Sequence, residues 1–269
     1  MKFRHLFIDS RYRTSGSDSD FSINLSETVE TEEGARCYVG GVTFSNVFYT
    51  IEEGLNDIWY VEVSSTVLGL GPGAYGLQLT YGNYGGAELA AEMQTRLRSI
   101  DGGALVSYIS KTGRMQINMS GGRSIKVWSD QELTNPSDRN FWLLKSPTFH
   151  YDINNPRSMG EVLRATPRPP ANAYLSELIQ LQPYNVLYLH SSLTTFDGID
   201  TLGRSGIIAR VPLEKTYGYV NHYEGPFLEQ GWFDVGKMSF RNIRFSLRNA
   251  RGVVVPLHGS HLSVHLIFD

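Results

Sequence analysis

The sequence predicts an all-β fold, and three observations support that prediction. Short stretches in which apolar and polar residues alternate recur along most of the 269 residues. Turns rich in Gly, Asn and Pro separate these stretches, and only one stretch has the apolar spacing of a helix. About a dozen short strands with this turn spacing are typical of β-sandwiches and jelly rolls. We therefore predict a jelly-roll β-sandwich with one short helix and an irregular insertion.

The carboxyl end carries the clearest strand pattern. Apolar residues occupy alternate positions from Ile243 to Leu247 and again from Leu262 to Phe268, with Arg, Ser and His between them. Such period-two alternation indicates strands with one buried face. A strand at the end of a chain leaves an open edge unless another strand pairs with it. We therefore expect the last strand to lie inside a sheet.

The rest of the chain repeats this pattern in shorter pieces. A bulge or bend is expected at Gly40–Gly41, because glycine pairs inside a strand often mark such irregularities. The helix is expected from Ala87, where Leu89, Met93 and Leu97 follow helical spacing, and it should stop before Gly102. Further strands are expected at residues 21–25, 37–48, 58–63, 104–109, 115–119, 125–128, 186–190, 207–211 and 217–220.

These elements predict a single jelly-roll-type domain over residues 1–269. Residues 1–20 are expected to form a short N-terminal arm. Residues 129–170 are the least regular part of the chain, with several Asn-Pro and Pro-rich breaks, and are expected to be an insertion.

Composition excludes several classes of protein. The net charge of −3 gives no overall attraction to nucleic acid or to an anionic membrane. The one cysteine, Cys37, cannot build a disulfide framework, and its place in a predicted strand favours a core residue over a nucleophile. No apolar run approaches the ~20 residues of a membrane span, and the apolar stretch at the start of the chain is too short for a signal peptide. These features favour a protein that is made or assembled inside a cell.

Three motifs suggest chemistry, but each has a simpler interpretation. Residues 71–76 read Gly-Pro-Gly-Ala-Tyr-Gly and match the dinucleotide-binding pattern, yet that motif needs a helix to begin inside it, and here a strand is expected. His261 and His265 share a face of a strand but lie roughly 13 Å apart at ~3.3 Å per residue, too far for one zinc ion. Asp197 and Asp200 could form a carboxylate or calcium site, although an ordinary acidic turn explains them. We therefore predict no enzyme activity, catalytic residue, cofactor or metal.

The amino-terminal segment is basic. Arg4, Arg11 and Arg13 lie close together, with Asp9 as the one acidic residue among them. One interpretation is an arm that contacts packaged DNA. The other is a surface strand whose charges are solvated.

Several segments along the chain together carry a resemblance to a known family. They are residues 6–13, 21–25, 45–51, 73–75, 207–212 and 245–252 with the final strand. In this order they resemble the penton (minor capsid) proteins of Polinton-like, adintovirus-like and virophage-like double-stranded DNA viruses. The resemblance implies a structural jelly-roll subunit of the virion, assembled inside the host cell. It also implies a homopentamer at each icosahedral vertex, with a larger major capsid protein as the neighbouring partner.

A ring of identical subunits needs two different contact patches on each subunit. Aromatic residues are enriched at interface cores, although ordinary core packing is the competing interpretation for them. The alternative function is a carbohydrate- or receptor-binding jelly roll, such as a spike or lectin-like domain. The candidate interface residues are Trp59, Tyr60, Tyr219, Tyr223, Phe227 and Trp232.

Overall fold

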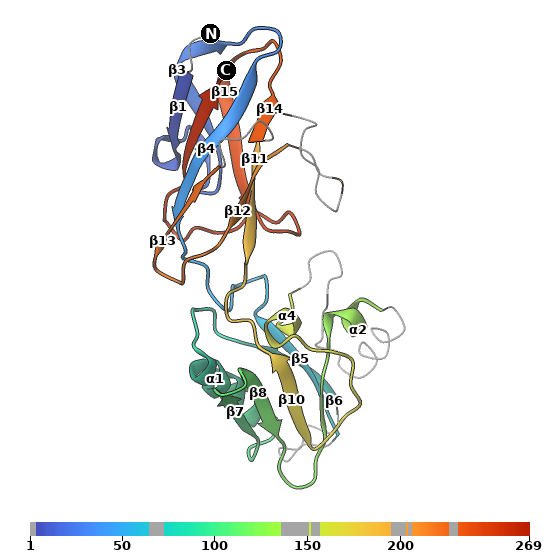
Figure 1. Cartoon of the computed structure of the whole chain (residues 1–269). Coiled ribbons are helices and arrows are strands. Elements are labelled where there is room, and N and C mark those ends of the chain that lie inside the picture. The colour runs from blue at the N-terminus through green and yellow to red at the C-terminus, as the bar shows by residue number, and fades with distance from the viewer. Residues whose placement is uncertain are drawn as a thin grey trace. The chain divides into compact units, whose positions relative to one another are not determined.

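The chain forms two compact units (Figure 1). Unit 1 contains residues 1–48 and 184–269, and unit 2 contains residues 49–183 between them. The sequence predicts one domain, and it predicts an insertion that begins only at residue 129. The structure instead makes the whole of 49–183 a separate compact unit. The computed structural model describes residues 4–64, 73–135, 151, 157–194, 203, 206–225 and 231–269.

Unit 1 contains two antiparallel sheets, here called sheet A and sheet B. The strand order is β1-β16-β4-β13 in sheet A, with β14 also paired to β4, and β12-β11-β15-β3-β2 in sheet B. The strands of sheet A are β1 (Arg4–Asp9), β4 (Arg36–Ser45), β13 (Val220–Glu224), β14 (Trp232–Asp234) and β16 (Ser263–Phe268). Those of sheet B are β2 (Ser15–Gly16), β3 (Asp20–Glu30), β11 (Val186–Ser191), β12 (Ile207–Pro212) and β15 (Ser239–Arg248), and the 3-10 helix η1 (Ser10–Tyr12) follows β1.

This strand order confirms the jelly-roll prediction. If β1, β3, β4, β11, β12, β13, β15 and β16 are numbered 1 to 8 along the chain, sheet A reads 1-8-3-6 and sheet B reads 5-4-7-2. Eight strands connected in this way across two sheets form a jelly roll. The rings of Phe240 in β15 and Phe268 in β16 lie 6.0 Å apart, so the two sheets meet through their apolar faces.

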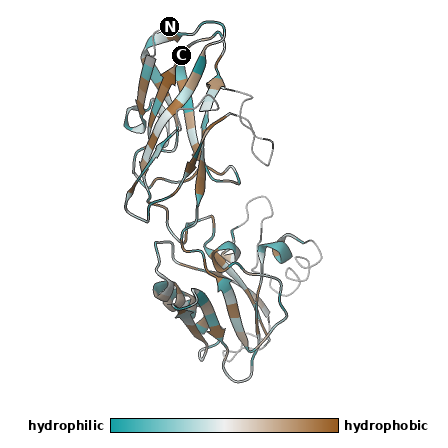
Figure 2. Ribbon diagram, viewed as in Figure 1, coloured by the Kyte–Doolittle hydropathy of each residue, from teal (hydrophilic) through white to brown (hydrophobic). Residues whose placement is uncertain are grey.

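The terminal strands pair with each other, as the carboxyl-end pattern requires. β16 lies between β1 and β4, so the last strand has a partner on both sides, and Figure 1 shows the two chain ends close together. Val264, Leu266 and Phe268 are buried, which confirms the period-two pattern that Figure 2 shows in its colours. β16 therefore has no open edge, and β1 is the edge strand on this side of sheet A.

The predicted irregularity at Gly40–Gly41 is present. The register between β4 and β16 shifts between His265 and Leu266, which pair with Gly41 and Val39 and leave Gly40 as the extra residue. A Cβ atom at position 40 would lie 2.8 Å from Nδ1 of His265, so only glycine fits there without movement of that ring. The bulge thus aims His265 over the backbone of β4.

Unit 2 combines two three-stranded antiparallel sheets with one longer helix. The sheet orders are β10-β8-β7 and β6-β5-β9. The predicted helix is confirmed as α1 (Gly86–Arg98), whose buried face carries Leu89, Met93 and Leu97. The remaining elements are β5 (Ile58–Val63), β6 (Gly73–Gln78), β7 (Leu105–Ile109), β8 (Arg114–Asn118), β9 (Ile125–Val127), α2 (Asp130–Thr134), α4 (Gly160–Leu163) and β10 (Ala173–Leu178).

Part of the predicted insertion, 129–170, is included in the description of unit 2. Its described residues contain the short helices α2 and α4, and Leu133, Val162 and Leu163 are buried. The described segments therefore contribute to the core of unit 2. Among the described residues, no helix is long and apolar enough to cross a membrane.

Candidate functional site

Two of the predicted interface residues lie in the core of unit 2. Trp59 and Tyr60 sit on β5 and are only 1% and 2% exposed. They belong to two different apolar clusters, and the ring of Tyr60 meets that of Tyr151 edge to face at 5.7 Å. Burial raises the pKa of the Tyr60 hydroxyl. The prediction that these residues form an interface is therefore wrong, because β5 is buried on both faces.

The other predicted interface residues lie along one edge of sheet A. β16 takes one side of β4, so β13 and β14 both pair with its other side. Tyr219 precedes β13 and is 67% exposed, while Tyr223 and Trp232 are half-buried. We call Tyr219, Tyr223 and Trp232 the aromatic edge. Phe227 lies outside the described residues.

The aromatic edge is held by contacts with β4. The ring of Trp232 lies 5.5 Å from that of Tyr38, and the guanidinium of Arg36 lies 5.3 Å above the indole. The backbone carbonyl of Tyr219 accepts a hydrogen bond of 2.8 Å from the amide of Asn46. These contacts hold the indole of Trp232 and the backbone of Tyr219 in place, and short edge strands limit uncontrolled pairing with other chains.

The opposite edge of sheet A carries a cluster that the sequence analysis did not identify. On β1, Phe7 is 74% exposed, and its ring stacks on that of His265 at 4.3 Å. Nδ1 of His5 lies 2.9 Å from Nε2 of His265. We call His5, Phe7 and His265 the β1 cluster. Residues 5 and 7 are two positions apart, so on a strand they share a face. No sequence signal, however, shows that the two ends of the chain pair.

The histidines near the carboxyl end do not form a metal site in the part of the chain that the structure describes. There, no group of three or more His, Cys, Asp or Glu side chains could hold a metal ion. His265 faces His5 across the strand pair, and burial together with the neighbouring His5 lowers its pKa. His261 is exposed in the segment before β16. The face that carries His265 is thus an aromatic surface.

The basic amino-terminal segment is not a free arm. β1 pairs with β16 from Arg4 to Asp9, and β2 pairs with β3. The Arg11 guanidinium donates to both carboxylate oxygens of Asp9 at 3.0 Å, and this bond holds the pKa of Asp9 below its usual range. The prediction of an arm over residues 1–20 is therefore wrong for the described residues, because strand pairing uses the backbone that an arm would leave free.

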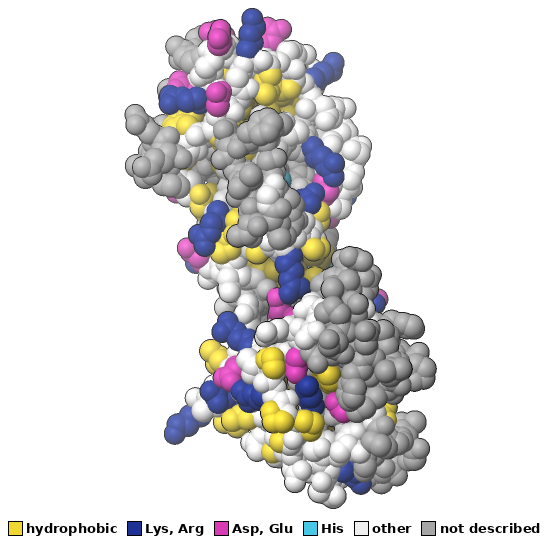
Figure 3. All heavy atoms as spheres, turned by 90° about the vertical axis from the view of Figure 1, so that its right-hand side faces the viewer, with side chains coloured by type: hydrophobic (Ala, Val, Ile, Leu, Met, Phe, Trp, Pro, Cys, Tyr) yellow, Lys and Arg dark blue, Asp and Glu magenta, His cyan; other side chains and the backbone are white. Residues whose placement is uncertain are grey.

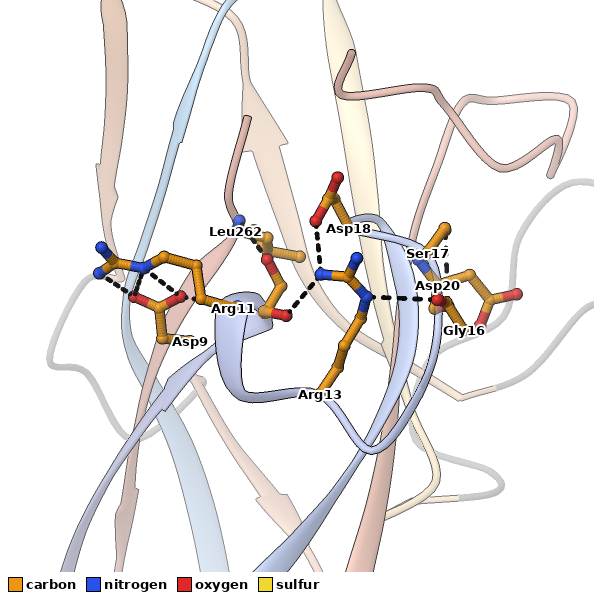
Figure 4. A network of polar contacts seen from close by, with 9 residues as sticks. Asp9, Arg11, Arg13, Gly16, Ser17, Asp18, Asp20 and Leu262 are labelled. Atoms are coloured by element: carbon orange, nitrogen blue, oxygen red, sulfur yellow. Dashed lines mark hydrogen bonds and ion pairs between the residues drawn. The ribbon is translucent and has the colours of Figure 1, made fainter. Parts of the chain in front are cut away.

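Arg13 is also occupied within unit 1 (Figure 4). Its Nη1 donates to the carbonyl of Ser10 at 3.0 Å and to Asp18 at 2.7 Å, and its Nε donates to the carbonyl of Gly16 at 3.2 Å. Arg13 therefore closes the loop between η1 and β3. Both arginines have acidic partners, which reduces the charge that they can offer to DNA.

The structure also shows where two of the remaining sequence motifs lie. β6 begins at Gly73, so a strand occupies the place where a dinucleotide motif needs a helix to begin. Cys37 is buried in β4, and burial raises the pKa of its thiol to about 12, which suits a core residue. Asp197 and Asp200 lie outside the described residues.

Comparison with known proteins places the fold. No protein-family model matches the chain, and no curated protein matches it in sequence. Among solved structures, the chain is similar to the selenomethionine-labelled mavirus penton protein, with a TM-score of 0.54 and 8% sequence identity. The match covers 100% of this chain and 99% of that protein. The two proteins therefore share a fold over their full lengths, including the unit between β4 and β11.

Proposed function

We propose that the chain is a structural capsid subunit, a penton protein that forms pentamers at the vertices of an icosahedral virion. The observation that supports this most is the full-length match in fold to a penton protein. A shared jelly roll alone would say little, because this fold hosts many functions. The match also spans the inserted unit 2, which a simple jelly roll lacks.

The two edges of sheet A suit a ring of identical subunits. A cyclic ring joins one patch of each subunit to a different patch of the next. The β1 cluster and the aromatic edge lie at opposite ends of the strand order in sheet A, and both present exposed aromatic rings. We assign the contact between subunits to these two edges, with the larger major capsid protein as a further partner.

The mass of the full chain in solution tests this proposal. Native mass spectrometry should show assemblies of five copies of the 30.2 kDa chain. Phe7→Asp and Tyr219→Asp should each return the protein to monomers, because each buries a charge in the contact. Tyr81→Asp is the matched control, since Tyr81 is an exposed tyrosine in unit 2.

A chain that stays monomeric both alone and with the major capsid protein of the same virus would contradict the proposal. Pentamers that survive both edge substitutions would leave the capsid role standing but move the contact elsewhere. The alternative function, a carbohydrate- or receptor-binding module, predicts binding on a glycan array by a chain that does not oligomerise.

A further inference from the structure

Sheet B carries an open pocket on its outer face, with a volume of about 500 Å³. Phe245 and Leu247 point into the core of unit 1, so Arg244, Ser246 and Arg248 lie on the other face of β15. The strand register places His190 of β11 opposite Ser246. His190 and Ser246 therefore line the pocket together with the two arginines on either side of Ser246.

The pocket has an excess of positive charge among its described residues. Arg244 donates to both oxygens of Asp20 at 2.8 Å. Among the described residues, Arg248 donates hydrogen bonds only to neutral acceptors, Ser246 Oγ at 2.9 Å and the carbonyl of Gly252 at 3.0 Å, and its charge also helps to lower the pKa of Asp20. Two guanidinium groups thus share one carboxylate, that of Asp20.

Donor hydrogens remain available to a ligand. Among bonds between described residues, Nη1 of Arg244 and Nη2 of Arg248 are not used. Ser192 Oγ accepts the amide hydrogen of Arg244 at 3.0 Å, which leaves its own hydroxyl hydrogen to donate. Guanidinium and hydroxyl donors around one pocket match an oxyanion with several acceptor oxygens.

We propose that this pocket binds a phosphate or sulfate ester carried on a molecule of about the size of one sugar. The volume lies in the range of small-ligand pockets, which run from about 300 to 1,000 Å³. A polynucleotide fits less well, because it needs a row of cations along its backbone. In Figure 3, the Lys and Arg side chains of the described residues are interspersed with Asp and Glu on the face shown.

Calorimetric titration of the full chain at low salt tests the proposal. Glucose 6-phosphate or glucose 6-sulfate should bind, and neutral glucose should not. Arg248→Gln should weaken binding at least tenfold. Arg241→Gln is the matched control, because Arg241 is an exposed arginine on the same strand that contacts only the carbonyl of Leu25 among the described residues and does not line the pocket. The two esters distinguish a phosphorylated from a sulfated ligand.

A second measurement does not depend on a variant that folds. In the wild-type chain, the ester should shift the imidazole NMR signals of His190 more than those of His258. Equal binding of glucose and its esters, equal losses in Arg248→Gln and Arg241→Gln, or binding of inorganic phosphate alone would overturn the proposal. Binding of DNA oligonucleotides without any binding of the esters would also overturn it. None of these results bears on the pentamer, which is tested by mass.

Discussion

Phe21 and Phe245 lie opposite each other on β3 and β15, with ring centres 5.8 Å apart in the core of unit 1. Both side chains are fully buried. Replacing Phe245 with Ala should lower the free energy of unfolding by about 3–5 kcal/mol, because it removes a large apolar side chain and leaves a cavity. Urea unfolding followed by circular dichroism measures this loss.

Phe7→Ala is the control for that prediction. Its ring is exposed and stacks only on the face of sheet A, so the loss of stability should stay below about 1 kcal/mol. Comparison of the two substitutions therefore distinguishes a phenylalanine that packs in the core from one that lies on the surface. If Phe7→Ala destabilised the monomer as much as Phe245→Ala, Phe7 would have to belong to the core.

Asp101 is a buried carboxylate that ties the end of α1 to the turn after β8. Its oxygens accept hydrogen bonds from the Ser120 hydroxyl at 2.7 Å, from the Ser120 and Gly103 amides at 3.1 Å and from Arg123 at 2.8 Å. Asp101→Asn removes the charge and places an amide nitrogen against these donors. The expected loss is about 1.5–3 kcal/mol at pH 7.

The same carboxylate predicts a pH dependence. Burial alone raises the pKa of Asp101, but the hydrogen bonds from Ser120 and Gly103 and the charge of Arg123 outweigh it and hold the pKa below its usual range. A lowered pKa in the folded state contributes stability above the unfolded pKa of about 3.9, and this stability is lost as the pH falls through the folded value. The gap in urea midpoint between wild type and Asp101→Asn should therefore narrow below about pH 4. A constant gap from pH 7 to pH 3 would contradict this assignment.

At the scale of one element, deletion of β1 tests whether the amino-terminal segment is a strand of sheet A or a free arm. It covers the outer edge of β16 and buries Ile8. Deleting residues 1–9 should lower the stability of unit 1 by at least about 2 kcal/mol from Ile8 alone, and it should expose the edge of β16 to aggregation. Urea unfolding and size-exclusion chromatography check both effects.

Deletion of residues 1–3 alone is the control for this experiment. If residues 1–9 were an arm outside the fold, the chains that lack residues 1–9 and residues 1–3 would be equally stable. The longer deletion would then reduce only the retention of DNA in assembled particles. The structure favours a loss of stability on deletion of residues 1–9, because β1 is paired with β16. Arg11 and Arg13 also have acidic partners within unit 1 already, which leaves them less charge to offer to DNA.

The local pattern of apolar residues was enough to predict the strands and the helix. It could not predict which distant segments pair with each other. The alternation in β15 and β16 and the helical spacing of α1 follow from which residues must be buried, so the sequence shows them directly. Trp59 and Tyr60 were misassigned because β5 is covered on both faces, which is a property of its neighbours. The arm over residues 1–20 was misassigned because its partner strand lies more than 250 residues away in the chain.

The same reasoning explains the candidate sites. The aromatic edge was predicted in part, since Tyr219, Tyr223 and Trp232 are concentrated in one segment of the chain. The β1 cluster and the pocket on sheet B were not predicted. Each brings together residues from strands that are far apart in sequence, such as Phe7 with His265 and His190 with Ser246. Only the strand register reveals such pairs.

At the scale of the whole molecule, unit 2 interrupts the jelly roll between β4 and β11 without separating the two ends that it joins. The rings of Phe48 and Tyr184, the last and first residues of unit 1 on either side of unit 2, lie 5.1 Å apart, edge to face. Both strands that lead to these residues are paired within unit 1. A chain in which a short Gly/Ser linker replaces residues 49–183 should therefore keep the jelly roll folded, because the linker closes a short gap at little entropic cost.

Far-UV circular dichroism, a cooperative urea transition and dispersed NMR signals would show that the shortened chain folds. Native mass spectrometry of the same chain then asks where the subunit contacts lie. Since the β1 cluster and the aromatic edge both belong to unit 1, the shortened chain should still form pentamers, and Tyr219→Asp should still break them. A folded but strictly monomeric jelly roll, compared with a pentameric full chain, would mean that unit 2 supplies the contacts between subunits and that the edges of sheet A do not.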